Sequence, residues 1–144
     1  MSLAMTKAER EGFLAGTRVA IIGIAEDGRG PLAVPVWYEF VPPNEIRILT
    51  GGHSKKVDLL RKAGRMSLCV QTETPPYQHV SVEGPVRIQS GLDTTELARS
   101  MAIRYLGEQL GAAYIELTKG EREDNVLVTL SIERWITVDY NRMV

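Results

Sequence analysis

The sequence predicts a mainly β fold, in which six antiparallel strands form a small closed or split barrel with three or four flanking helices. Short apolar segments near the N-terminus are separated only by turn residues, which leaves no room for the crossover helix that parallel strands need. Later segments alternate apolar and polar residues, as half-buried strands do. One of these contains a central glycine, which is typical of the bend at a barrel corner.

Length and composition fit one domain. The chain has 144 residues, of which 44% are hydrophobic, and this is enough for one core but too little for two full domains. A second methionine, Met5, follows Met1 closely. We therefore set residues 1–5 aside as a non-native or disordered lead and take residues 6–144 as the domain.

Charge and residue counts exclude several functional classes. The formal net charge of -1 lacks the basic excess of most nucleic-acid-binding proteins. One cysteine and two histidines offer no zinc-type spacing, so we expect no metal site. No apolar run approaches the ~20 residues of a membrane helix and no signal peptide is recognisable, so we expect a cytoplasmic protein that binds no membrane.

The N-terminal half is predicted to form two helices and four strands. Thr6 and Glu9 make a capping box that starts a helix over residues 7–15. A second helix covers residues 54–63 and ends at Gly64. The strands are rich in Val, Ile and aromatic residues, are bounded by Gly, Pro or Asn, and cover residues 18–25, 32–40, 45–50 and 66–72.

The C-terminal half is predicted to contain two strands and a pair of helices. Apolar residues alternate on both sides of Gly84, which indicates one bent strand over residues 80–88. Helices over residues 94–106 and 108–117 meet at Gly107. Alternation from Asn125 to Asp139 predicts the sixth strand.

The segment from residue 50 to residue 60 joins a strand end to a helix start and puts two lysines in the first helical turn. A cation there is disfavoured by roughly 0.3–1 kcal/mol, because a helix N-terminus is already positive. A phosphate would reverse the sign, since backbone N–H groups, the Ser54 hydroxyl, Lys55 and Lys56 could all contact it. Asp58 can offset part of the repulsion through an i,i+3 contact with Lys55. The alternative is a solvated lysine pair, with Ser54 as an ordinary helix cap.

Several motifs resemble, in the same order, those of the pyridoxamine 5′-phosphate oxidase-like superfamily of FMN-binding split barrels. Thr50, three residues and then Ser54-Lys55-Lys56 are similar to its phosphate-binding T-x-x-x-S-[RK]-K segment. Val80-Ser81-Val82-Glu83-Gly84 resembles its V-x-V-x-G strand. Arg104-Tyr105-Leu106-Gly107 and Arg134-Trp135 resemble a subgroup of flavin and deazaflavin oxidoreductases, many of which use coenzyme F420.

The resemblance implies a split-barrel fold, a homodimer with the cofactor site between subunits, and a set of cofactor-binding residues. Ser54, Lys55 and Lys56 would contact the phosphate, and Thr50 and Gly51 would line the ribityl or phosphate end. The ring system would lie beside the strand of Pro35, Val36 and Trp37. His79 would stack on the cofactor or hydrogen-bond to it. Independently of the resemblance, Tyr77 follows two prolines in a loop, where its ring could contact the ligand or the partner subunit or simply pack.

The resemblance also implies a choice of chemistry. Nothing after Tyr140 resembles the Arg- and Trp-containing segment that holds pyridoxal phosphate in the oxidases, which argues against vitamin B6 oxidation. Lys55 stands where FMN-dependent relatives commonly have arginine, so a point charge replaces a bidentate fork. We therefore favour F420 over FMN, in an oxidoreductase that transfers hydride between the cofactor and a small planar substrate.

Two alternatives from other functional classes remain. The same barrel could carry FMN, F420 or haem without catalysis, and His53 or His79 would then be available as an axial haem ligand. In the second, Lys55 and Lys56 face only solvent, and the domain serves as an interaction module.

Overall fold

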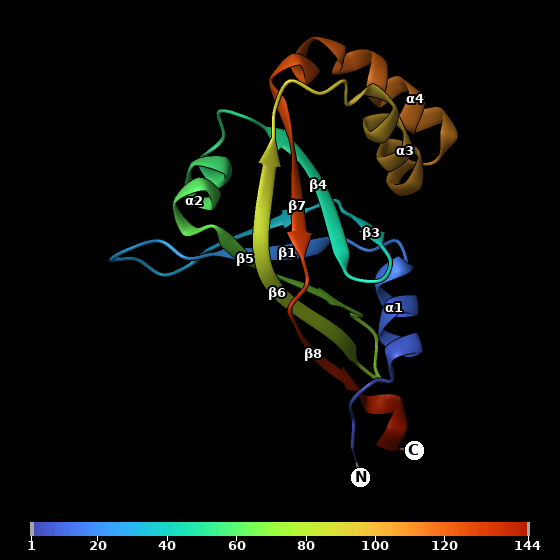
Figure 1. Cartoon of the computed structure of the whole chain (residues 1–144). Coiled ribbons are helices and arrows are strands. Elements are labelled where there is room, and N and C mark those ends of the chain that lie inside the picture. The colour runs from blue at the N-terminus through green and yellow to red at the C-terminus, as the bar shows by residue number, and fades with distance from the viewer. Residues whose placement is uncertain (1, 144) are drawn as a thin grey trace.

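The computed structural model describes residues 2–143 as one strongly bent sheet with helices at its margins (Figure 1). The strands are β1 Ala20–Ile24, β2 Leu32–Val36, β3 Glu39–Val41, β4 Glu45–Gly51, β5 Arg65–Gln71, β6 Gln78–Gln89, β7 Asn125–Ser131 and β8 Arg134–Asp139. The α-helices are α1 Lys7–Ala15, α2 Lys55–Ala63, α3 Thr95–Leu106 and α4 Glu108–Leu117. Short 3-10 helices, η1 and η2, cover Lys119–Asp124 and Tyr140–Met143.

The long strand β6 is the axis of the sheet. Its first part pairs with β5 on one side and β8 on the other, and its last residues pair with β7. Hydrogen-bonded neighbours run β2-β1-β5-β6-β7-β4-β3, and all pairings are antiparallel. This confirms the predicted antiparallel split-barrel architecture with flanking helices.

Gly84 sits where β6 passes from one set of partners to the other. A Cβ atom at this position would lie 1.8 Å from the backbone oxygen of Ser131, at the end of β7. The backbone N–H of Glu133 donates to the Glu83 carbonyl oxygen across the same point, at 2.9 Å. The glycine therefore allows two backbones to approach at the bend, as the sequence predicts.

The strand number differs from the six predicted, because two of the predicted strands are interrupted. Residues 32–40 divide into β2 and β3, since the Tyr38 N–H donates to the Tyr105 hydroxyl at 3.1 Å rather than to a neighbouring strand. Residues 125–139 divide into β7 and β8, where the Ile132 N–H donates to the Asn44 carbonyl oxygen at 2.8 Å. Alternation continues through both interruptions and does not reveal them.

The core fills the concave side of the sheet and includes the inner faces of α1 and α2, through Phe13, Leu14, Val57, Leu59 and Leu60. Tyr38 is fully buried there, and its hydroxyl donates to the Leu14 carbonyl oxygen at 2.7 Å. Burial raises the pKa of Tyr38 to about 12 and also raises that of Tyr105.

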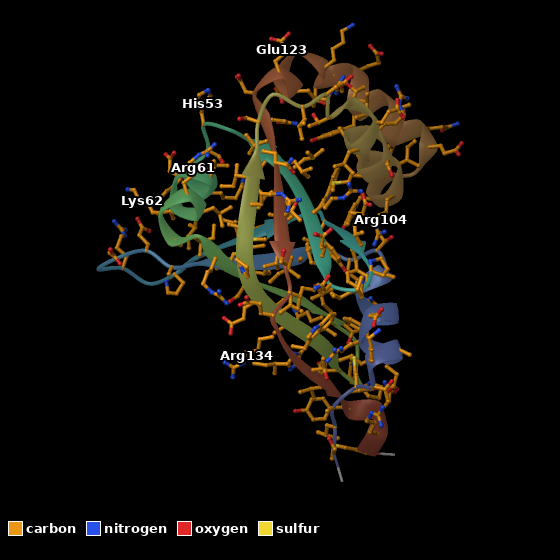
Figure 2. The ribbon with its side chains drawn as sticks, in the orientation of Figure 1. His53, Arg61, Lys62, Arg104, Glu123 and Arg134 are labelled. Carbon is orange, nitrogen blue, oxygen red and sulfur yellow. The ribbon has the colours of Figure 1, made fainter. Side chains whose placement is uncertain are left out.

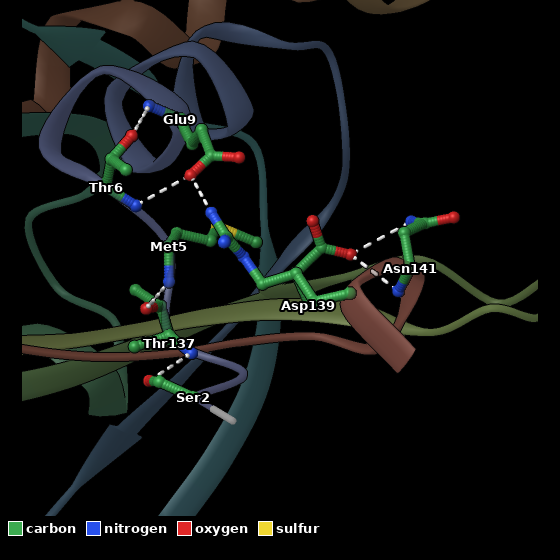
Figure 3. Close-up of polar contacts among 9 residues, drawn as sticks. Ser2, Met5, Thr6, Glu9, Thr137, Asp139 and Asn141 are labelled. Carbon is green, nitrogen blue, oxygen red and sulfur yellow. Dashed lines mark hydrogen bonds and ion pairs between the residues drawn. The ribbon is translucent and has the colours of Figure 1, made fainter. Parts of the chain in front are cut away.

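The two ends of the chain meet on β8 (Figures 1 and 3). The capping box of Thr6 and Glu9 is present and starts α1 as predicted. Residues 2–5, which the sequence analysis set aside, contact the sheet: the Met5 N–H donates to the Thr137 hydroxyl at 2.9 Å, and the Leu3 carbonyl oxygen accepts from the Asp139 N–H at 2.8 Å.

Candidate functional site

A hollow of about 390 Å³ opens between the end of β2, the end of β4, the start of α2 and the side of α4. Its walls carry five of the residues predicted to bind a cofactor, namely Pro35, Val36, Trp37, Thr50 and Lys56. Val19, Leu49 and Tyr114 complete the lining. The fold thus brings together strand residues and a helical lysine that are far apart in the sequence.

A second chamber of about 210 Å³ adjoins this hollow beneath the α3–α4 hairpin. The two spaces share Trp37, Leu49, Thr50 and Tyr114. Buried Met101 and Ile115 form its apolar part, and Thr118, Arg122 and Asn125 give it a polar side. The predicted residue Gly51 lines this chamber but not the outer hollow.

Trp37 is held rigidly between β2 and the α3–α4 hairpin. Its ring stacks on Tyr105 with a centroid distance of 5.0 Å and an interplanar angle of 4°. Tyr114 lies 5.5 Å away at 52°. Tyr105 is fixed in turn, because its hydroxyl donates to the Arg18 carbonyl oxygen at 2.8 Å. The indole therefore presents a fixed aromatic plate, which suits a planar ligand.

The α3–α4 hairpin is anchored to α1 by Arg104, which Figure 2 shows between the two elements. Its Nη2 donates to the carbonyl oxygens of Ala15 and Gly16, at 3.0 and 2.8 Å. These oxygens lie at the C-terminal end of α1, where a cation is electrostatically favoured. This anchor keeps the two tyrosines of the hairpin against Trp37.

The start of α2 differs in one respect from the prediction. Ser54 is the N-cap, and its hydroxyl accepts from the Val57 N–H at 3.4 Å. Half-buried Lys56 lines the hollow, whereas exposed Lys55 makes an ion pair with Glu26 of the β1–β2 hairpin at 3.5 Å. The predicted contact of Lys55 with Asp58 is therefore replaced by a long-range partner, which helical spacing does not reveal.

The turn before α2 is shaped by glycine for a reason internal to the fold. The Gly52 N–H donates to the Asp124 carbonyl oxygen at 2.7 Å, and a Cβ on Gly52 would lie equally close to that oxygen. Gly51 has open space around it. Figure 2 shows the exposed His53 pointing away from the sheet, and it does not line either space.

Tyr77 and His79 lie far from the hollow along β6 and its preceding loop. The Tyr77 carbonyl oxygen accepts from the Tyr140 N–H at 3.0 Å, and its side chain is 51% exposed. His79 pairs with Gln71 of β5 and Val138 of β8, and its Nδ1 is buried without a hydrogen-bond partner among the described residues. One copy of the chain does not bring these two residues to the other predicted site residues.

The outward face of β1 and β8 exposes several apolar side chains among polar ones. Val19, Ile21 and Ile136 are 53%, 45% and 51% exposed there. A shallow depression of about 970 Å³ on this face runs from Val19 to the loop at Pro75 and Pro76. Since Val19 also lines the hollow, this depression adjoins the candidate site.

Three residues that line the hollow were missed by sequence reasoning: Val19, Leu49 and Tyr114. Leu49 occupies an outward position on β4, which alternation alone could have suggested. Tyr114 lies on α4, and only the packing of the hairpin over Trp37 brings it to the site. No local pattern distinguishes it from other partly exposed helical aromatics.

The part of the chain at residues 2–143 contains neither a metal-type cluster nor a membrane-spanning helix. No three His, Cys, Asp or Glu side chains there are grouped as a metal centre would require. None of the helices in this part of the chain combines the length and apolar character needed to cross a membrane.

Comparison with solved structures identifies the fold. The chain is similar to the conserved hypothetical protein Rv2991 from Mycobacterium tuberculosis, with a TM-score of 0.77 at 21% identity over 98% of this chain and 89% of that one. It is also similar to an F420 reductase, with a TM-score of 0.64 at 15% identity and coverages of 88% and 94%. A FAD- and haem-binding protein from Mycobacterium smegmatis gives a TM-score of 0.71 at 17% identity, with coverages of 96% and 73%.

A further similar structure is a putative pyridoxamine 5′-phosphate oxidase from Listeria innocua, with a TM-score of 0.66 at 10% identity and coverages of 91% and 96%. The chain therefore shares the split-barrel fold of these structures. No family profile and no curated protein sequence matches it. The structural neighbours bind different groups under one fold, so function depends on the residues of the hollow.

Proposed function

We propose that this protein is an oxidoreductase that binds a phosphate-bearing deazaflavin or flavin, with F420 favoured over FMN, in the hollow at the ends of β2 and β4. The observation that carries the proposal is the shared lining of that hollow by Lys56 and by Pro35, Val36 and Trp37. A cation at one end and an aromatic plate at the other suit a planar ring joined to a phosphate.

Each wall has a distinct role in this proposal. Lys56 and the helix-capping Ser54 bind the phosphate at the start of α2. The backbone of Pro35 and Val36 and the fixed ring of Trp37 orient the planar ring system, while Thr50 and Gly51 contact the chain between ring and phosphate. The bound cofactor supplies the hydride chemistry, and the protein binds it and excludes water.

The active unit in this proposal is a homodimer. The outward face that exposes Ile21 and Ile136 adjoins the hollow at Val19. Exposed apolar surfaces of this kind mark association sites. Pairing of two copies over this face would close each hollow. Tyr77 and His79 of one copy would then contact the cofactor that is bound in the hollow of the second copy.

A second candidate function is a non-catalytic carrier of haem or flavin. The specific observation that favours it is the buried Nδ1 of His79, which has no partner among the described residues. One neighbour is itself a FAD- and haem-binding protein. A Soret band that appears on haem addition and disappears in His79→Ala would favour this function.

The decisive experiment is calorimetric titration of the purified protein with F420, FMN and haem, repeated with Lys56→Ala. We expect the substitution to weaken cofactor binding by about 1–3 kcal/mol, the range for loss of a charge-assisted hydrogen bond. Lys62→Ala is the matched control, because Lys62 lies in the last turn of the same helix. Equal cofactor affinities of the two variants would contradict the proposed phosphate site at Lys56. If the protein binds none of the three ligands, the result would favour an interaction module.

A further inference from the structure

Figure 1 shows the β1–β2 hairpin projecting beside α2. Glu26 of the hairpin forms an ion pair with Lys55 in the first turn of that helix. Glu26 Oε1 lies 3.5 Å from Lys55 Nζ, and the Glu26 side chain is only 20% exposed. Lys55 is more open, with 60% of its side chain exposed. The hairpin therefore supplies a fixed carboxylate that occupies one of the two lysines of the candidate phosphate site.

This ion pair changes the charge that a ligand meets. Of the two lysines in the first turn of α2, Lys56 alone lines the hollow, while the charge of Lys55 is compensated by Glu26. The first turn also contains the exposed carboxylate of Asp58. Two cations and one carboxylate thus lie in the first turn of α2, with Glu26 beside them, and Lys56 is the lysine that faces the ligand space without an ion-pair partner among residues 2–143.

We infer that Glu26 is a specificity-determining residue, which adapts the site to a singly charged phosphodiester rather than a doubly charged phosphomonoester. The inference rests on the proposed function and names its ligand class more closely. FMN ends in a phosphomonoester, whose second proton leaves near pH 6 as in other phosphomonoesters. Coenzyme F420 carries its phosphate as a diester, with one charge.

The physical reason is proportionality between Coulomb energy and ligand charge. Replacing Glu26 with glutamine removes one negative charge and releases Lys55 toward the phosphate. A dianion gains twice as much from that change as a monoanion bound at the same place. The ion pair in the wild-type protein therefore lowers the affinity for the phosphomonoester more than the affinity for the phosphodiester. It does so without a change in the shape of the site.

The test compares FMN with its phosphate monomethyl ester, which has the same ring and chain but one phosphate charge. Calorimetry at pH 7.5 should show that Glu26→Gln raises FMN affinity about fivefold and ester affinity about twofold, from the range for exposed ion pairs. At pH 5.5, where FMN regains its second proton, the two gains should converge. Asp27→Asn is the matched control, because it removes the neighbouring hairpin carboxylate, for which residues 2–143 provide no ion-pair partner.

A double variant separates specificity from general charge. Glu26→Gln combined with Lys55→Gln should return the preference between FMN and its ester to the wild-type value, because neither charge remains. Equal gains for both ligands in Glu26→Gln, or no gain, would overturn the inference while wild-type binding still supported the proposed function. Failure of the wild-type protein to bind FMN, the ester and F420 would overturn both.

Discussion

Two regions of the molecule are built in opposite ways. One is the crossing, where β6 bends at Gly84 beside the end of β7, and the other is the hollow at the ends of β2 and β4. At the crossing, backbone meets backbone around Gly84, and no side chain fits between them. In the hollow, half-buried or exposed side chains such as Trp37, Lys56 and Tyr114 form the walls. Substitutions at the crossing should therefore change the free energy of unfolding, whereas substitutions in the hollow should change ligand binding and leave the fold intact.

The largest expected effect tests the crossing directly. Gly84→Ala would place a Cβ atom 1.8 Å from the Ser131 oxygen, which is backbone and cannot move aside. We expect the free energy of unfolding to fall by more than about 3 kcal/mol, measured by urea denaturation. Gly51 lines the inner chamber and has open space around it. Gly51→Ala should therefore change the free energy of unfolding by less than about 0.5 kcal/mol. Similar losses in the two variants would contradict the comparison.

The buried hydroxyl of Tyr38 predicts a pH dependence of stability. Desolvation raises its pKa in the folded protein to about 12 from the ordinary value of 10.0. Because the folded state holds the proton more tightly, the stabilisation is complete below pH 10 and is lost as the pH rises toward 12. The loss is about 3 kcal/mol. Chemical denaturation of Tyr38→Phe across this pH range should show a smaller decline in the free energy of unfolding than the wild type shows. An equal decline would mean that groups other than Tyr38 cause the pH dependence.

The exposed apolar side chains of β1 and β8 predict an effect on association rather than on folding. Ile21→Lys introduces a charge into the proposed dimer interface at a side chain that is 45% exposed in one copy. We expect sedimentation to show weaker association, with the dimer dissociation constant raised about 30-fold and little change in the free energy of unfolding. Leu117→Lys, at an 84% exposed site on α4, should leave association unchanged. A wild-type protein that sediments as a monomer would contradict the proposed homodimer.

The smallest effect concerns the cap of α2. Its bond from the Val57 N–H to the Ser54 hydroxyl is long, at 3.4 Å. Ser54→Ala should therefore cost about 0.5–1 kcal/mol of stability without ligand. With FMN present in excess, thermal unfolding should show a larger difference from the wild type, because the variant also loses a phosphate contact. If the difference in thermal stability between the variant and the wild type is the same with and without FMN, Ser54 does not contact the phosphate.

Sequence patterns predicted elements well where the cause is local. The capping box at Thr6 and Glu9, the helix stop at Gly64 and the bend at Gly84 depend on a few neighbouring residues. The breaks at Tyr38 and Ile132 were missed, because the backbone N–H of each donates to a distant residue, Tyr105 or Asn44. Propensity reports only what the nearby chain allows.

The candidate site was predicted in part for the same reason. The order of residues placed Thr50 and Lys56 near one helix start, and the fold brings Pro35–Trp37 to the same hollow. The sequence did not reveal that Tyr114 lines the hollow. It also did not reveal that Tyr77 and His79 lie apart from the hollow within one copy. Both depend on how the sheet bends and on how the α3–α4 hairpin packs, which are properties of many residues together.

The antiparallel barrel and the helix that starts beside two lysines follow from the sequence, because alternation, capping and glycine geometry act over a few residues. Which of the two lysines faces the ligand space depends on the packing of distant elements. Glu26, 29 positions before Lys55, pairs with it because the β1–β2 hairpin lies beside α2. Charges that meet across such distances along the chain are set by the curvature of the whole sheet, and no local pattern encodes it.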